Sequence, residues 1–294
     1  MISFKNIEAS EYGLFKKHID INKFLNSEYS FSTFFCWQHA SRMDYTIIEN
    51  CICVRGDWQG ESYYYFPLGE KNDIQRAIIK LMDYCKSNGK QFILMNMSGQ
   101  MIEYFEEFGL DKYFIKEARR EFFDYVYKRE KLITLSGKKL HGKRNHFNYF
   151  VANYDYSLED ITPENEDGCR EMLKRSIEGR SEDVDGEISI TMNAFDNRDE
   201  INLISGALMA NGKVAGVILT EDFYDMPVIQ IAKADTGVRG APVALFKLFF
   251  EKKLTSEYVN FMDDMGIEGL RQAKMSYAPD FFIEKYVYTL NLQV

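Results

Sequence analysis

The order of sequence patterns in the first half of the chain recurs in the second half, and this repetition constrains the fold most strongly. Each half shows strands separated by turns, a long helix, a short buried strand, a short helix and a last strand. Local sequence agrees as well, because residues 94–99 correspond in pattern to residues 260–266. The economical explanation is an internally duplicated α/β (α+β) unit. We therefore expect two domains, at residues 1–130 and 131–294.

The predicted elements follow from hydrophobic period and turn residues. Residues 8–42 suit two or three helices, and the first repeat follows with strands in 44–67, a helix capped by Asp73 that ends near residue 88, a strand at 92–97, a helix at 99–108 and a strand at 122–127. The second repeat has strands at 203–209, 214–221 and 228–234, a helix at 241–254, a strand at 258–262, a helix at 267–277 and a strand at 281–290.

The overall composition limits the classes of function. The net charge of -9 and the pI near 5.2 argue against broad, sequence-independent nucleic-acid binding, so any anionic partner must be held at a local patch. No apolar run reaches the length of a membrane span, and the N-terminus lacks a signal-peptide pattern, so we expect a cytoplasmic protein. The five cysteines form no CxxC pair, and we expect them to be reduced and buried.

A basic segment at residues 136–151 joins the two halves and is predicted to form a helix. Ser136 is a suitable N-cap, and an apolar stripe follows at helical spacing: Leu140, Phe147 and Val151. Residues 131–154 contain five Lys or Arg and no Asp or Glu, although a helix N-terminus normally favours acids. Free N–H groups beside clustered cations form an anion site, and the alternative is a solvated basic face. The anion-binding candidates are Lys138, Lys139, Lys143, Arg144 and His146.

Arg144 is the most informative of these candidates, because the helical wheel places it on the apolar stripe. A buried Arg requires an anionic partner, which is either an acid of the fold or a ligand.

A second cationic cluster follows the predicted buried strand at residues 258–262. Asp263 and Asp264 come directly after the strand, and Arg271 and Lys274 lie three residues apart on the next helix. Ligands of open α/β sheets bind just beyond the carboxyl ends of strands. The alternative is a surface helix whose cations pair with the two aspartates.

These motifs together carry a resemblance to a known family. The matching residues are 125–127, 132, 135–139, 143–146, 150, 264–266, 269–271, 274, 276–277 and 279. They resemble a bacterial family similar to the C-terminal, cytosolic domain of phosphatidylglycerol lysyltransferase, over nearly the whole chain. The resemblance implies two tandem acetyltransferase-like (GNAT) domains with mixed, mostly antiparallel sheets flanked by helices, and chemistry in the second domain. The residues of this sequence that match the family's functional positions are Lys143, Arg144, Asp264, Arg271 and Lys274.

The related enzymes transfer an aminoacyl group from aminoacyl-tRNA to a lipid or to a cell-wall precursor. This sequence departs from the lysyltransferase in having no membrane-spanning N-terminal region, so the acceptor stays open between a lipid and another small molecule. No cofactor is certain; the donor is aminoacyl-tRNA, or acetyl-CoA in an alternative. The expected partners are charged tRNA and an anionic small molecule or lipid headgroup.

The acetyl-CoA alternative rests on the loop that contains Arg239, Gly240 and Ala241. An acetyltransferase presents backbone N–H groups to the CoA pyrophosphate from this position. The glycines do not have the required spacing, and Pro242 lacks an N–H group, so a tight strand-to-helix turn is the simpler interpretation. The sequence contains no P-loop, HExxH or GxSxG motif and no recognisable metal site.

The hypothesis for aminoacyl transfer assigns a role to each cluster. Arg271 and Lys274 would bind a phosphate or the developing oxyanion, Asp264 would orient them or accept the proton, and Lys143 and Arg144 would grip the donor's phosphates. The alternatives are a non-catalytic module that binds an anion or nucleotide, and an acetyl-CoA-dependent N-acetyltransferase. All of this assumes that both cationic clusters line one recess and are not neutralised separately by neighbouring carboxylates.

Overall fold

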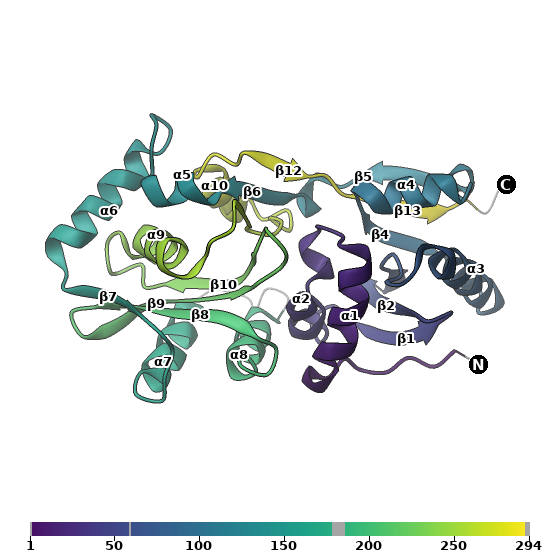
Figure 1. The fold of residues 1–294 in the computed structure, drawn as a ribbon, viewed down its shortest axis with the longest axis horizontal. Helices are drawn as coiled ribbons and strands as arrows, with labels where there is room; N and C mark the ends of the chain where they lie inside the picture. Colours follow the sequence, from purple (N-terminus) through teal and green to yellow (C-terminus); the bar gives the residue numbers. More distant parts are fainter. Residues whose placement is uncertain (1, 59, 178–185, 292–294) are drawn as a thin grey trace. The chain divides into compact units, whose positions relative to one another are not determined.

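The chain forms two compact units, which the computed structural model describes for residues 2–58, 60–177 and 186–291 (Figure 1). Unit 1 consists of Met1–Phe123 together with Ile283–Val294, and unit 2 consists of Asp124–Phe282. None of the helices among the described residues has both the length and the hydropathy needed to cross a bilayer. All five cysteines are buried and free, as predicted.

Unit 1 is built on a six-stranded sheet in the order β1-β2-β3-β4-β13-β5. Its elements are α1 (Tyr12–Asn22), α2 (Phe31–Trp37), β1 (Asp44–Ile48), β2 (Cys51–Trp58), β3 (Glu61–Tyr64), α3 (Lys71–Ser87), β4 (Ile93–Met97), α4 (Gly99–Glu107), β5 (Phe114–Ala118) and β13 (Tyr286–Leu290). The pair β3–β4 is parallel and the other pairs are antiparallel. Helix α3 buries one stripe: Ile74, Ala77, Ile78, Leu81 and Cys85. Its N-cap is Glu70 rather than the predicted Asp73, which lies in the first turn.

Unit 2 is built on a seven-stranded sheet in the order β12-β6-β11-β10-β9-β8-β7. Its elements are β6 (Asp124–Lys128), α5 (Arg129–Thr134), α6 (His141–Asn153), β7 (Tyr156–Glu159), α7 (Glu166–Ile177), α8 (Glu187–Asp196), β8 (Leu203–Ala210), β9 (Lys213–Glu221), β10 (Val228–Ala234), α9 (Ala241–Lys253), β11 (Tyr258–Asn260), α10 (Glu268–Met275) and β12 (Phe281–Ile283). The pair β10–β11 is parallel, and the pairs β6–β11, β9–β10, β8–β9 and β7–β8 are antiparallel.

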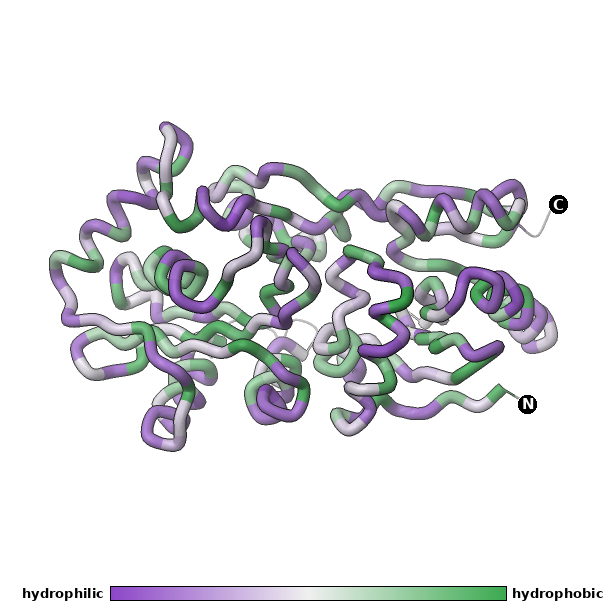
Figure 2. Tube along the Cα trace, viewed as in Figure 1, coloured by the Kyte–Doolittle hydropathy of each residue, from purple (hydrophilic) through white to green (hydrophobic). Residues whose placement is uncertain are grey.

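The centre of the second sheet is covered on both faces. Strand β9 is buried from Val214 to Glu221, because α9 packs on one face and α7 on the other (Figures 1 and 2). Two glycines let α9 approach closely: a Cβ at Gly206 would lie 2.8 Å from the Phe249 ring, and a Cβ at Gly216 would lie 3.2 Å from Leu245. The core is therefore close-packed directly beneath the helix that precedes the second cationic cluster.

The last strand of each half completes the sheet of the other half. Strand β13 lies between β4 and β5, antiparallel to both, and β6 lies in the equivalent place between β12 and β11. The two exchanged strands carry the same Tyr-Val-Tyr sequence, at residues 125–127 and 286–288. The units thus differ from the expected domains, and the strand predicted at 281–290 is split between two sheets. Hydrophobic period identifies a strand but does not specify its partner, which explains the difference.

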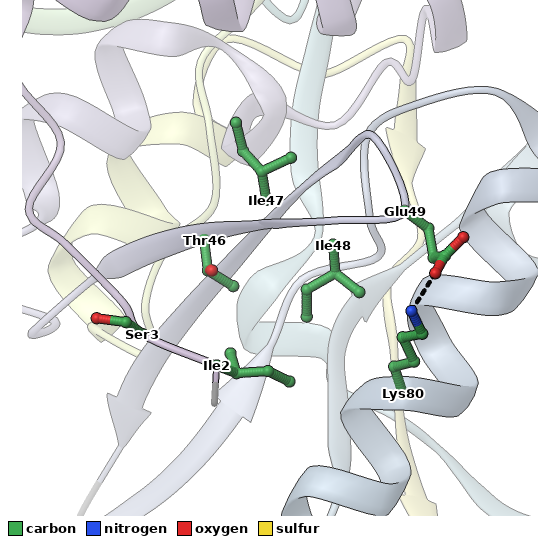
Figure 3. A pocket seen from close by; sticks show the side chains of 7 residues that line it. All are labelled: Ile2, Ser3, Thr46, Ile47, Ile48, Glu49 and Lys80. Atoms are coloured by element: carbon green, nitrogen blue, oxygen red, sulfur yellow. Dashed lines mark hydrogen bonds and ion pairs between the residues drawn. The ribbon is translucent and has the colours of Figure 1, made fainter.

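Figure 3 shows a surface hollow in unit 1, on β1, α3 and the N-terminal segment. Its lining residues are Ile2, Ser3, Thr46, Ile47, Ile48, Glu49 and Lys80. Glu49 is engaged by ion pairs with Arg76 and Lys80. The hollow contains none of the predicted site residues.

Candidate functional site

The basic segment forms a loop before it becomes a helix. Leu135 ends α5 in the left-handed conformation (φ 49°), and α6 begins only at His141, with Leu140 as N-cap and no side-chain capping bond. The prediction that Ser136 caps the helix is therefore wrong, because the turn after α5 uses the residues that would have formed the first helical turn. Lys138 and Lys139 are exposed in this loop.

Arg144 hydrogen-bonds to neutral groups of the protein. Its guanidinium donates to the backbone carbonyls of Leu135 and Gly137 (3.2 Å for Gly137), and it lies 3.4 Å from Nδ1 of His141. The side chain is only partly buried. Carbonyls at a helix C-terminus carry partial negative charge and attract cations. The partners that the structure shows are carbonyls at and after the end of α5, the first of them nine residues earlier, and an anionic ligand of Arg144 stays a prediction.

Lys143 is the cation of α6 with the least compensation. Its Nζ lies 3.9 Å from the ring centroid of Tyr277, and loss of water lowers its pKa from the usual 10.5. In the parts of the chain that the structure describes, no carboxylate forms an ion pair with it. Lys143 is thus a partly desolvated positive charge supported mainly by an aromatic face.

Asp264 is the centre of a buried polar network after β11. Its side chain is fully buried; Arg271 binds it through both oxygens (Nε–Oδ2 2.9 Å, Nη2–Oδ1 2.8 Å), Tyr125 donates its hydroxyl to Oδ2, and the N–H of Gly266 donates to Oδ1 at 2.9 Å. Burial alone would raise the pKa of Asp264, but the bonds from Arg271, Tyr125 and Gly266 hold it below its usual value. This geometry fixes Asp264 as a carboxylate.

Lys274 holds the loop between β11 and α10. Its Nζ donates to the carbonyls of Phe261 (2.6 Å) and Asp263, and its own carbonyl accepts a bond from the hydroxyl of Tyr127 at 2.8 Å. The loop needs such support because Met262 and Met265 adopt positive φ angles of 60° and 52°. Arg271 and Lys274 therefore both bind groups of this loop, Arg271 through the Asp264 side chain and Lys274 through backbone carbonyls.

Tyr277 brings the two cationic clusters into one region of unit 2. Its ring contacts Lys143, its N–H donates to the carbonyl of Lys274 at 3.1 Å, and its side chain packs against Phe246 and Phe261. The beginning of α6 thus lies beside the end of α10. The predicted recess between the clusters, and the roles assigned to their residues, stay predictions.

Helix α6 passes directly over the start of α9, where the CoA alternative placed its loop. Gly240 is the N-cap of α9 with φ 91°, and a Cβ there would lie 2.3 Å from the carbonyl oxygen of His146 and 2.9 Å from Cβ of Phe150. The guanidinium carbon of Arg239 lies 4.2 Å from the ring centroid of Tyr149. The side chain of His146 is exposed.

Three backbone N–H groups near this turn already have partners. The N–H groups of Gly237 and Val238 donate to Asp235, and the N–H of Ala241 donates to the carbonyl of Val238 at 3.0 Å. Pro242 has no N–H group. The geometry favours the tight-turn interpretation of this segment over a pyrophosphate cradle.

Buried polar residues of the sheet, which were not predicted from the sequence, hydrogen-bond to the residues of the site. Asn260 donates to Asp124 at 2.9 Å and accepts the N–H of Met262 at 2.7 Å, and both side chains are fully buried. Tyr125 and Tyr127 support Asp264 and Lys274 from the exchanged strand β6. The available signal was a polar residue inside each of two apolar strands, which is unusual unless the group is paired.

The chain matches the family described as "Phosphatidylglycerol lysyltransferase, C-terminal" over residues 20–289, so the predicted resemblance is confirmed. An uncharacterised protein of Mycoplasmoides gallisepticum is 24% identical over 186 residues; the match covers 60% of this chain and 59% of that protein's length.

Solved structures confirm the predicted fold. A conserved protein of unknown function from Bacteroides thetaiotaomicron is 27% identical, with a TM-score of 0.88 over 99% of this chain and 100% of that one. L-PGS from Bacillus licheniformis is 14% identical, with a TM-score of 0.67 over 97% of this chain and 93% of that one. FemX is 8% identical, with a TM-score of 0.56 over 99% and 97%.

Proposed function

Because the chain belongs to the phosphatidylglycerol lysyltransferase C-terminal family, we propose that it transfers an aminoacyl group from aminoacyl-tRNA to an amine or hydroxyl acceptor. The acceptor is a lipid headgroup or another small molecule. The acceptor's nitrogen or oxygen forms a bond to the ester carbonyl carbon, the bond to the tRNA ribose oxygen breaks, and the acceptor's proton passes to that oxygen. Charged tRNA places this reaction in the cytoplasm.

The observation that carries the proposal is the state of Lys143. A cation that has lost water without gaining a carboxylate is stabilised when an anion binds beside it. Phosphates of a tRNA acceptor end provide such an anion, and the exposed Lys138 and Lys139 extend the positive charge along the preceding loop. Arg144, which is held at the end of α5, maintains the shape of that loop.

Arg271 is the second group in the proposal. A guanidinium has five N–H donors, and the two bonds to Asp264 leave other N–H groups for a ligand. Its side chain is 34% exposed, so it is oriented by Asp264 yet accessible to a phosphate or a developing oxyanion. Asp264 acts as the orienting group rather than the proton acceptor, because a fully engaged carboxylate with a lowered pKa is a weak base. Lys274 positions the loop.

The second unit is the better candidate for chemistry. Helix α4 of unit 1 occupies the place in the repeat that α10 occupies in unit 2. It carries Glu103, Glu106 and Glu107 and no Lys or Arg. An acidic helix at this position repels phosphates, so the anion-binding groups belong to unit 2.

One observation favours a second candidate, a non-catalytic module that binds an anion. Asp264, Arg271 and Lys274 are all engaged within the protein, as residues with a purely structural role would be. The acetyl-CoA alternative has less support, because α6 covers the start of α9 and the N–H of Ala241 is already bonded.

The test measures both binding and transfer. Lys143→Ala should weaken binding of charged tRNA about tenfold, the value for a bond to a charged group, and should lower transfer of a radiolabelled aminoacyl group in parallel. The matched control is Lys116→Ala, since Lys116 also lies over an aromatic ring, at 4.3 Å from Tyr286, but belongs to unit 1. Unchanged tRNA binding by Lys143→Ala would refute the proposal. Binding without transfer to any acceptor would establish the module, and thermal stabilisation by CoA would establish the acetyltransferase.

A further inference from the structure

An arginine that precedes α9 lies over the ring of a tyrosine of α6. Arg239, which is exposed, lies over the partly buried ring of Tyr149, with 4.2 Å between the guanidinium carbon and the ring centroid. No ion pair of Arg239 with a carboxylate occurs among the residues that the structure describes. The tyrosine therefore holds the guanidinium close to its ring without a neutralising acid.

This stack is held rigidly by the backbone. Gly240 follows Arg239 and abuts the carbonyl of His146, one turn before Tyr149 on α6. This contact holds the start of α9 against α6. Arg239 and Tyr149 therefore cannot move apart unless the contact between Gly240 and His146 is lost. A preorganised surface loses little entropy when it binds a ligand.

The surroundings suit a nucleic-acid base. Planar guanidinium groups and aromatic rings are the surfaces on which proteins stack unpaired RNA bases. The exposed side chains of Asn145 and His146 on the same helix can bond to base edges, and residues 132–154 contain no acid. The nearest carboxylate in sequence, Asp235, accepts the N–H of Gly237 at 2.8 Å.

A second cation–π contact on α6, between Lys247 and Phe147, differs because the lysine also has partners within the protein. Lys247 lies 5.2 Å from the centroid of Phe147, but it also donates to the carbonyl of Ile133 and pairs with Glu251. Its charge is satisfied within the protein. Arg239 has no such partners in the described parts of the chain, which marks its stack as a surface for a ligand.

We propose that Arg239 and Tyr149 form a stacking platform for an unpaired RNA base, with the base lying on the outer face of the Arg239 guanidinium. This inference rests on the proposed function and deepens it, because the unpaired 3′ end of tRNA provides the base. The platform and Lys143 lie at different places along α6, so they would contact different parts of the same bound donor.

The experiment uses Arg239→Lys, which retains the positive charge but removes the planar guanidinium group. Binding of fluorescent tRNA with an intact 3′ end, and of tRNA lacking its unpaired 3′ end, is followed by anisotropy over a salt series. We expect the variant to bind intact tRNA about tenfold more weakly, as for the loss of one stacked base, with an unchanged slope of log K against log salt. Binding of the truncated tRNA should not change. The matched control is Arg175→Lys, an exposed arginine of α7 in the same unit.

Thermal unfolding shows that each variant is folded, and Tyr149→Leu is the second variant, with the same expected loss. Unchanged binding of intact tRNA by Arg239→Lys would overturn the platform, because a simple phosphate contact survives exchange for Lys. A short single-stranded RNA oligonucleotide separates the two hypotheses. If the wild type binds the oligonucleotide through Arg239 but not tRNA, the platform stands and the proposed function falls. If it binds neither RNA, both fall.

Discussion

The contact between α6 and the start of α9 can be tested with one methyl group. Gly240→Ala places a Cβ 2.3 Å from the carbonyl oxygen of His146, far inside van der Waals contact, and in a residue with φ 91°. The atoms that it meets are the backbone of α6 and Cβ of Phe150, which cannot move aside like the end of a flexible side chain. The substitution therefore tests backbone strain and overpacking together.

Two other glycines separate these effects. Gly137 also has a positive φ, 85°, but nothing lies within 4 Å of its added Cβ, so Gly137→Ala should cost only the left-handed strain, about 1–2 kcal/mol. Gly142 lies within α6 with open space around it, and Gly142→Ala should stabilise by about 0.5–1 kcal/mol. Gly240→Ala adds overpacking of about 1–3 kcal/mol to the strain, which gives about 2–5 kcal/mol in all.

Thermal unfolding of the three variants measures the series. At about 2–4 °C per kcal/mol, Gly240→Ala should lower the Tm by roughly 4–20 °C, Gly137→Ala by a few degrees, and Gly142→Ala should raise it slightly. If Gly240→Ala costs no more than Gly137→Ala, then α6 does not lie against the start of α9, and it neither covers the CoA turn nor fixes Arg239 beside Tyr149.

Three further predictions concern charged groups. The lowered pKa of Lys143 implies that the free energy of unfolding of the wild type rises with pH between that pKa and 10.5. Lys143→Met should be more stable than the wild type at neutral pH, and denaturant titrations of the variant should not show this rise. Asp264 has a lowered pKa, so its contribution to the free energy of unfolding is complete above pH 3.8 and is lost as pH falls through the lowered pKa. Asp264→Asn should therefore lower the free energy of unfolding by about 2 kcal/mol at pH 7, and its Tm should fall less steeply at acidic pH than that of the wild type. In unit 1 the fully buried Lys285 donates to Glu28 at 2.6 Å, and Lys285→Met should cost about 3–5 kcal/mol in urea unfolding. Adding Glu28→Gln, which removes the unpaired charge but keeps an acceptor for Asn96, should recover part of this loss, whereas no recovery would argue against a direct pair.

The candidate site was only partly predictable. Asp264, Arg271 and Lys274 follow a buried strand, and the cations of residues 138–144 stand out in a stretch without acids, so local sequence was sufficient to select them. Their partners were not predictable, because the carbonyls that bind Lys274 belong to the preceding loop and the tyrosine that binds Asp264 belongs to a strand 139 residues earlier. Side-chain chemistry states what a residue requires but does not identify the group that provides it.

Although β5, α5, β7, α7 and α8 were not predicted, the sequence by itself determined the family and the order of the strands and helices that were predicted for the two halves. These follow from the periodic burial of apolar residues and from turn residues, which act over a few positions along the chain. Only the tertiary structure decided that β6 and β13 exchange sheets, that Arg144 binds the end of α5, and that α6 lies on the start of α9. Each of these depends on contacts between segments distant in sequence, and such contacts are chosen by the packing and hydrogen bonding of the whole unit rather than by any local pattern.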